Sequence, residues 1–152
     1  MNHKLLSALV AIFVLLLLLV IFVRERWTTP ADELKTVLGY YTFLLGREQA
    51  NFEMHGAYVE LRDLLGRGTG RYRVTSKCQD GYCFEVHAIK EATKASYTIR
   101  IFPNRNTPSD RRHLISLYAD ETQIVRVSYG SPPADSTSAA LSPAEMRRFT
   151  SR

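Results

Sequence analysis

Two cysteines have the spacing of a disulfide. Cys78 and Cys83 are the only cysteines, and they bracket the sequence QDGY. Asp-Gly favours a two-residue hairpin turn. With the turn at Asp80-Gly81, the two cysteines lie opposite each other on the paired strands, at a position without backbone hydrogen bonds between them. The Cα atoms of such a pair are about 4.5 Å apart. This separation is near the lower end of what a disulfide tolerates. We therefore expect a structural disulfide. The alternatives are two reduced thiols or a redox pair, although the spacing is not that of the C-x-x-C redox motif. A disulfide indicates an oxidising compartment outside the cytoplasm.

The histidines do not form a recognisable metal site. His3, His55, His87 and His113 stand far apart in the chain. No H-E-x-x-H motif, Asp-rich calcium loop or G-x-S-x-G elbow occurs in the sequence. We therefore predict no catalytic residue, no cofactor and no metal, and hence a protein that is not an enzyme. A membrane-tethered enzyme whose site the sequence does not reveal remains a further hypothesis, beside the two given below.

The glycine-rich stretch GRGTG, residues 66–70, raises the question of phosphate binding. A phosphate-binding loop joins a strand to the N-terminus of a helix. Here a predicted helix comes before the stretch and a predicted strand follows it. We interpret it as a flexible connector.

The elements that position these residues begin with an apolar segment. Leu5–Val23 is nineteen residues long with Ser7 its only polar member. As a helix it would be about 28 Å long, close to the roughly 30 Å hydrocarbon core of a bilayer. We favour a retained transmembrane anchor over a cleaved signal peptide, because the apolar run is long and no small-x-small cleavage site follows it.

The predicted topology rests on the cysteines, because the charges that flank the anchor are almost balanced. A disulfide places the C-terminal domain in the periplasm or outside the cell. We expect a single-pass protein of the inner (cytoplasmic) membrane, whose residues 1–26 are the cytoplasmic stub and anchor, 27–129 the domain and 130–152 a flexible tail rich in Pro and Ser.

A helix is expected from Pro30, which suits the first helical position, to a stop at Gly56. Its apolar residues recur three and four apart. Its opposite face holds Lys35, Arg47, Glu48 and Gln49. A shorter helix is expected within residues 59–65. The predicted helix-packing interface consists of Leu34, Val37, Leu38, Tyr41 and Leu45.

From Arg71 onward the apolar period changes to two, which predicts strands. Short connections make the sheet antiparallel. The predicted fold class is α+β, with an N-terminal transmembrane helix extended by an amphipathic helix that packs on a four- to five-stranded sheet. The expected strands cover residues 71–75, 82–87, 97–101, 114–118 and 124–129.

The net charge of +5 is spread over several arginine clusters, of which Arg67, Arg71 and Arg73 form one. A nucleic-acid surface would interleave such residues with exposed aromatic side chains. The nearby tyrosines alternate as strand residues do, so we expect no nucleic-acid partner. The alternative function is a membrane-anchored, extracytoplasmic binding module whose basic face holds an anionic ligand or lipid.

Three phrases give the chain a resemblance to type IV pilins and the pseudopilins of type II secretion. Residues 49–58 resemble the end of the family's helix. Residues 97–103, YTIRIFP, are similar to its Y-T-I-x-A-x-P strand, and residues 117–126, LYADETQIVR, to F-Y-x-D-E-T-G-V-I-R. The prepilin cleavage motif and the N-terminal glutamate are missing, since no acid occurs before Glu25.

The resemblance implies a pilin-like fold and an unprocessed relative that stays in the membrane. The expected function is that of a non-catalytic structural or assembly component of a type II secretion or type IV pilus-like system. Its expected partners are membrane lipids, through Leu5–Val23, and other membrane or pilin-like proteins.

Overall fold

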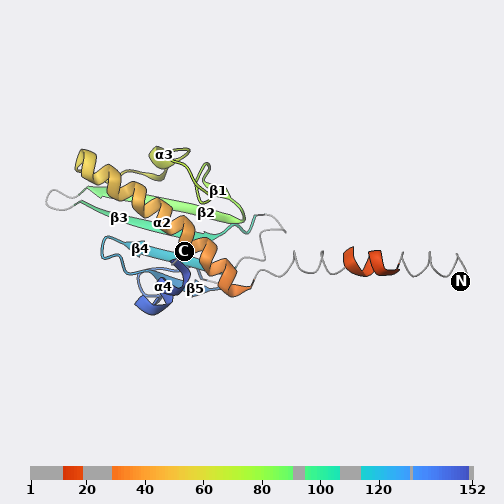
Figure 1. Ribbon diagram of the computed structural model, residues 1–152. Helices are drawn as coiled ribbons and strands as arrows, with labels where there is room; N and C mark the ends of the chain where they lie inside the picture. The colour runs from red at the N-terminus through yellow and green to blue at the C-terminus, as the bar shows by residue number, and fades with distance from the viewer. Residues whose placement is uncertain (1–11, 19–28, 91–94, 107–113, 131, 151–152) are drawn as a thin grey trace, which may run out of the picture. The chain divides into compact units, whose positions relative to one another are not determined.

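The computed structural model of the protein describes residues 12–18, 29–90, 95–106, 114–130 and 132–150. Residues 32–152 form one compact unit and residues 1–31 another. The described part of the larger unit is an α+β domain with a long helix and an antiparallel sheet of six strands (Figure 1). The α+β class and the antiparallel sheet agree with the prediction, but the sheet has six strands where four to five were expected.

The predicted membrane anchor requires a correction. Among the described residues, no helix is both long enough and apolar enough to cross a bilayer. Of the predicted span Leu5–Val23, residues 12–18 are described and are helical, and the other residues lie outside the described part of the chain. The longest helix has 26 residues but carries charged side chains along its length. This finding overturns the predicted transmembrane helix and the predicted inner-membrane location.

Helix α2 (Pro30–His55) begins and ends where its sequence predicts. Pro30 provides a preset backbone angle at the first helical position, and Asp32 and Glu33 lie in the first turn, where the helix dipole favours acids. Gly56 ends the helix with a φ of +68° and donates its N–H to the Phe52 carbonyl oxygen at 2.7 Å. Few residues other than glycine adopt this left-handed cap. Helix α3 (Leu61–Leu64) is a single turn within the segment predicted to be helical.

The sheet is a meander in which neighbouring strands in space are also neighbours in sequence (Figure 1). The pair β2·β3 is the longest and runs from Tyr82 opposite Pro103 to Lys90 opposite Ala95. The strands are β1 (Cys78–Gln79), β2 (Tyr82–Lys90), β3 (Ala95–Pro103), β4 (Ile115–Asp120), β5 (Arg126–Tyr129) and β6 (Ala139–Ala140).

The strand predicted at residues 71–75 does not form. Arg73 donates its N–H to the Gly70 carbonyl oxygen at 3.3 Å, and the Val74 carbonyl oxygen accepts the Gly66 N–H at 2.9 Å. These local hydrogen bonds make a looped connection, which glycines at positive φ allow. Val74 lies in this loop, but its side chain is buried in the core. It alternates with polar neighbours because it packs into the core, not because the segment is a strand.

Two regular elements lie within residues 130–152, the segment that the sequence predicted as a flexible tail. Strand β6 pairs with β5, and helix α4 (Pro143–Thr150) follows it. Ser142 and Glu145 cap α4 reciprocally, because the Ser142 N–H reaches Glu145 Oε2 at 2.8 Å and the Glu145 N–H reaches Ser142 Oγ at 3.2 Å. Met146 and Phe149 then pack against the core from α4.

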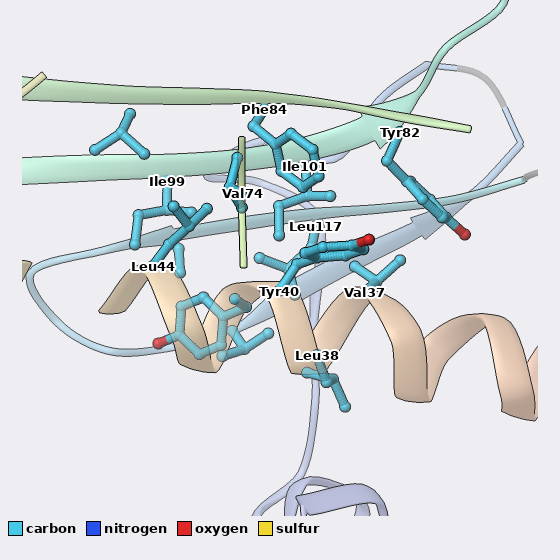
Figure 2. Packing of buried hydrophobic residues seen from close by; sticks show 14 of the residues in the cluster. Val37, Leu38, Tyr40, Leu44, Val74, Tyr82, Phe84, Ile99, Ile101 and Leu117 are labelled. Atoms are coloured by element: carbon cyan, nitrogen blue, oxygen red, sulfur yellow. The ribbon is translucent and has the colours of Figure 1, made fainter. Parts of the chain in front are cut away.

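The core lies between α2 and one face of the sheet. Figure 2 shows apolar side chains of α2, among them Val37 and Leu44, opposite sheet residues such as Ile99 and Leu117. These four side chains are 0 to 1% exposed. Leu61 and Leu64 of α3 belong to the same cluster. The buried side chains of α2 and α3 therefore belong to one core, and partly buried side chains of α4 pack against it.

Candidate functional site

The apolar side chains predicted as a helix-packing interface lie in the domain's own core. Leu34, Val37, Leu38 and Tyr41 are buried against the sheet, and Leu45 is partly buried beside them. The i, i+3 and i+4 spacing that marks this face does not distinguish an intermolecular partner from the chain's own sheet. Within the described domain, the sheet is the partner.

The predicted disulfide is present. Cys78 and Cys83 face each other across β1·β2 and are bonded, with Cα atoms 4.0 Å apart. Asp80 and Gly81 form the turn, with φ angles of 50° and 82°. The Asp80 carboxylate also accepts a hydrogen bond from the Tyr40 hydroxyl of α2. Burial, followed by this carboxylate, raises the pKa of Tyr40 to about 12, so the hydroxyl stays protonated and donates.

The face of the sheet away from the core carries a row of polar side chains in register. Glu85 of β2 lies opposite Arg100 of β3, Arg100 opposite Tyr118 of β4, and Tyr118 opposite Arg126 of β5. Side chains alternate between the two faces of a strand, and the neighbours Phe84, Ile99 and Leu117 point into the core. We call Glu85, Arg100, Tyr118 and Arg126 the cross-strand row.

Internal contacts hold the cross-strand row in place while leaving it accessible. Arg100 Nη1 lies 3.3 Å from Glu85 Oε2, with 38% and 26% of the two side chains exposed. Arg126 Nη1 donates to the Ser138 carbonyl oxygen at 2.9 Å. Burial, with Asp120 nearby, raises the pKa of Tyr118, so its phenol is neutral at pH 7. The row therefore offers two guanidinium groups, one carboxylate and one phenol to a partner.

One end of this outer face is covered by the chain itself. Ala134 donates its N–H to Ser116 Oγ at 2.7 Å, and Ser116 is fully buried beneath this segment. At the other end, His87 is exposed and Ile89 is 41% exposed. The cross-strand row lies between the covered end and this apolar, exposed end. Arginine and tyrosine, which make up most of the row, are enriched in protein interfaces.

Two buried carboxylic acids were missed by the sequence analysis, and both fall on the apolar stripe of α2. Glu33 precedes Val37 by four positions, and Glu48 follows Leu44 by four. Glu48, which was predicted to lie on the opposite, polar face, is instead fully buried. The four-residue spacing from Val37 and from Leu44 could have predicted their burial, because residues four apart share one face of a helix.

Glu48 is the more unusual of the two acids. Its Oε2 accepts the Val59 N–H at 3.1 Å, whereas its Oε1 has no hydrogen-bond partner among the described residues. Burial raises the pKa of this carboxyl to about 7, and the charge of Glu60 acts in the same direction. Glu48 therefore changes its charge near neutral pH inside the domain.

In the part of the chain that the structure describes, no three His, Cys, Asp or Glu side chains come close enough together to hold a metal ion. His3 and His113, two of the four histidines considered in the sequence, lie outside the described residues. His87 Nδ1 lies 3.5 Å from Glu60 Oε2 at the edge of the sheet.

Comparison of the chain with protein-family models, with curated proteins and with solved structures found no match.

Proposed function

We propose that the protein is a non-catalytic, pilin-like component that binds a partner protein through the outer face of its sheet. The observation that carries this proposal is that the two faces of the sheet differ in what they contact. The inner face packs on the domain's own helices, whereas the outer face presents the cross-strand row.

The order of elements supports the pilin-like part of the proposal. The N-terminal helix of the domain precedes the whole sheet, as the resemblance implies. The phrase at residues 97–103 lies in β3, and the phrase at residues 117–126 runs from β4 through a turn into the start of β5. A structural or assembly role in a type II secretion or type IV pilus-like system is the proposed setting.

The chemistry of the cross-strand row supports a protein as the partner. Arginine and tyrosine are enriched among the residues that contribute most to binding, because each combines a large contact area with hydrogen-bond donors. Arg100 and Arg126 flank Tyr118, and Glu85 adds an acid at one end. Side chains that project from four neighbouring strands suit an extended protein surface as the partner.

Site-specific photo-crosslinking tests this proposal in cells of the native host that make the full chain. A benzophenone amino acid replaces Thr98 or Tyr118, which lie on the outer face opposite His87 and Arg126. The matched control replaces Glu53, an exposed residue of α2. We expect secretion or pilus components to be crosslinked from the two sheet positions and not from the control.

Two results would overturn the proposal. The first is that Thr98 and Tyr118 yield no protein adduct in cells where the chain is folded, as shown by its intact disulfide. The second is that the same proteins are recovered equally from Glu53, which would mean that the sheet face has no special role.

A further inference from the structure

A groove on the opposite side of α2 from the sheet has the chemistry of a ligand site. It has a volume of about 500 Å³ and lies between the outward side of α2, the loop at residues 69–72 and Phe149 of α4. This volume is within the range of roughly 300–1,000 Å³ that is usual for small-molecule sites. The groove is formed by residues of the larger unit alone.

The walls of this groove are aromatic and its charges are positive. Phe43, Tyr72 and Phe149 line it and are partly buried against the core. Lys35 and Arg71 are the charged residues among its described lining, and both are exposed. The Arg71 guanidinium carbon lies 5.6 Å from the centre of the Tyr72 ring, which is within cation–π range.

Tyr72 is held in place as part of the groove. A Cβ atom built on Gly39 of α2 would lie 2.5 Å from the Tyr72 ring, so the ring lies directly against the helix backbone. The same ring makes an edge contact with Tyr40, with centroids 5.4 Å apart. The groove is therefore lined by a fixed aromatic surface, with a guanidinium group stacked beside it.

We propose that this groove binds a small organic anion with a flat aromatic body. The aromatic body would pack among Phe43, Tyr72 and Phe149, and the anionic group would pair with Arg71 and Lys35. Arginine suits a planar carboxylate, sulfonate or phosphate because its guanidinium can donate two parallel hydrogen bonds. This proposal is independent of the sheet face and goes beyond the proposed partner binding.

The test uses two fluorescent probes that differ by one charged group. Anilinonaphthalene sulfonate carries the anion and the aromatic body, and N-phenylnaphthylamine is its neutral counterpart. We expect the full chain to bind the sulfonate about tenfold more tightly than the neutral probe, since a charged hydrogen bond contributes on this scale. Arg71→Gln should weaken sulfonate binding about tenfold and leave binding of the neutral probe unchanged.

Arg62→Gln is the control, because Arg62 is 84% exposed and lines a different cavity. Backbone amide chemical shifts locate the binding, which should perturb Thr69, Gly70 and Arg71. The proposal fails if both probes bind equally, if Arg71→Gln and Arg62→Gln bind the sulfonate alike, or if the perturbed amides cluster around Leu61 and Leu65 instead.

Discussion

Glu33 Oε1 lies 2.6 Å from the backbone nitrogen of Leu114, although 81 positions separate the two residues. The same oxygen accepts the Ile115 N–H at 3.0 Å and the Tyr82 hydroxyl at 2.9 Å. One carboxylate in the first turn of α2 therefore satisfies donors at the beginning of β4 and of β2. Replacing an acceptor of this kind leaves buried donors without a partner, which costs more than the hydrogen bonds themselves contribute.

Glu33→Ala should lower the free energy of unfolding by about 3 kcal/mol, because the buried Ile115 N–H, the partly buried Leu114 N–H and the Tyr82 hydroxyl lose this acceptor. Glu33→Gln keeps one carbonyl oxygen and should cost less. Urea denaturation measures both effects. Glu53→Ala, at an exposed position of the same helix, is the control and should stay within about 0.5 kcal/mol of the wild type. An equal loss in Glu33→Ala and Glu53→Ala would contradict this account.

Glu48 should make the domain less stable as the pH rises through neutrality. Its carboxyl has a folded pKa of about 7, above the ordinary value of 4.5. The contribution of the buried, protonated form is therefore fully present below pH 4.5 and is lost as the pH rises through 7. We expect the full loss to be about 3 kcal/mol.

Glu48→Gln keeps the size of the side chain and removes the titration. The difference in unfolding free energy between this variant and the wild type should therefore grow between pH 5 and pH 8, in favour of the variant. Denaturant titrations at both pH values measure it. A constant difference would show that Glu48 does not titrate in this range.

Gly39→Ala should destabilise the domain, whereas Gly46→Ala should not. Alanine is the better helix former by about 1 kcal/mol at either position. At Gly39 the new Cβ would meet the Tyr72 ring at 2.5 Å, but at Gly46 nothing lies within 4 Å. We expect Gly39→Ala to cost about 1–3 kcal/mol, the usual range for overpacking, and Gly46→Ala to gain up to about 1 kcal/mol. Thermal unfolding of the pair compares them directly, and equal shifts would show that Tyr72 moves aside at no cost.

Reduction of the disulfide should destabilise the domain modestly. Cys78 and Cys83 are separated by 5 positions, so the bond closes a short loop. The chain-entropy model gives about 2 kcal/mol for a loop of this size. The double variant Cys78→Ser/Cys83→Ser should lose this amount in denaturant titrations and should no longer respond to a reducing agent. A variant as stable as the oxidised wild type would show that Tyr40 and Asp80 alone hold the hairpin.

The local signals in the sequence predicted the local structure well. Pro30 and Gly56 predicted both ends of α2, and Asp80-Gly81 predicted the register that brings Cys78 opposite Cys83. Each of these signals acts through the backbone angles of one or two residues, which a single sequence reveals directly. The disulfide was the one predicted site feature that the structure confirms.

The features that the sequence did not reveal depend on contacts between distant residues. Glu48 appeared polar and therefore solvent-facing, but tertiary packing places it inside the domain. Tyr72 and Val74 alternate with polar residues as a strand would, although the connection that holds them is looped. The cross-strand row requires the registers of four strands at once, and no short segment specifies these. The apolar segment Leu5–Val23 matched a membrane span by length and hydropathy alone.

The sequential order of the strands has a consequence for the way the chain folds. Each strand pairs with the one just before it, so the meander can grow by a succession of short loop closures, each of small entropic cost. Helix α2 is synthesised first, yet its Glu33 needs the N–H groups of Leu114 and Ile115. A ribosome-bound chain therefore cannot complete the hydrogen bonds of Glu33 until the start of β4 has emerged. Because this contact joins residues 81 positions apart, we expect α2 to reach its final position late in folding.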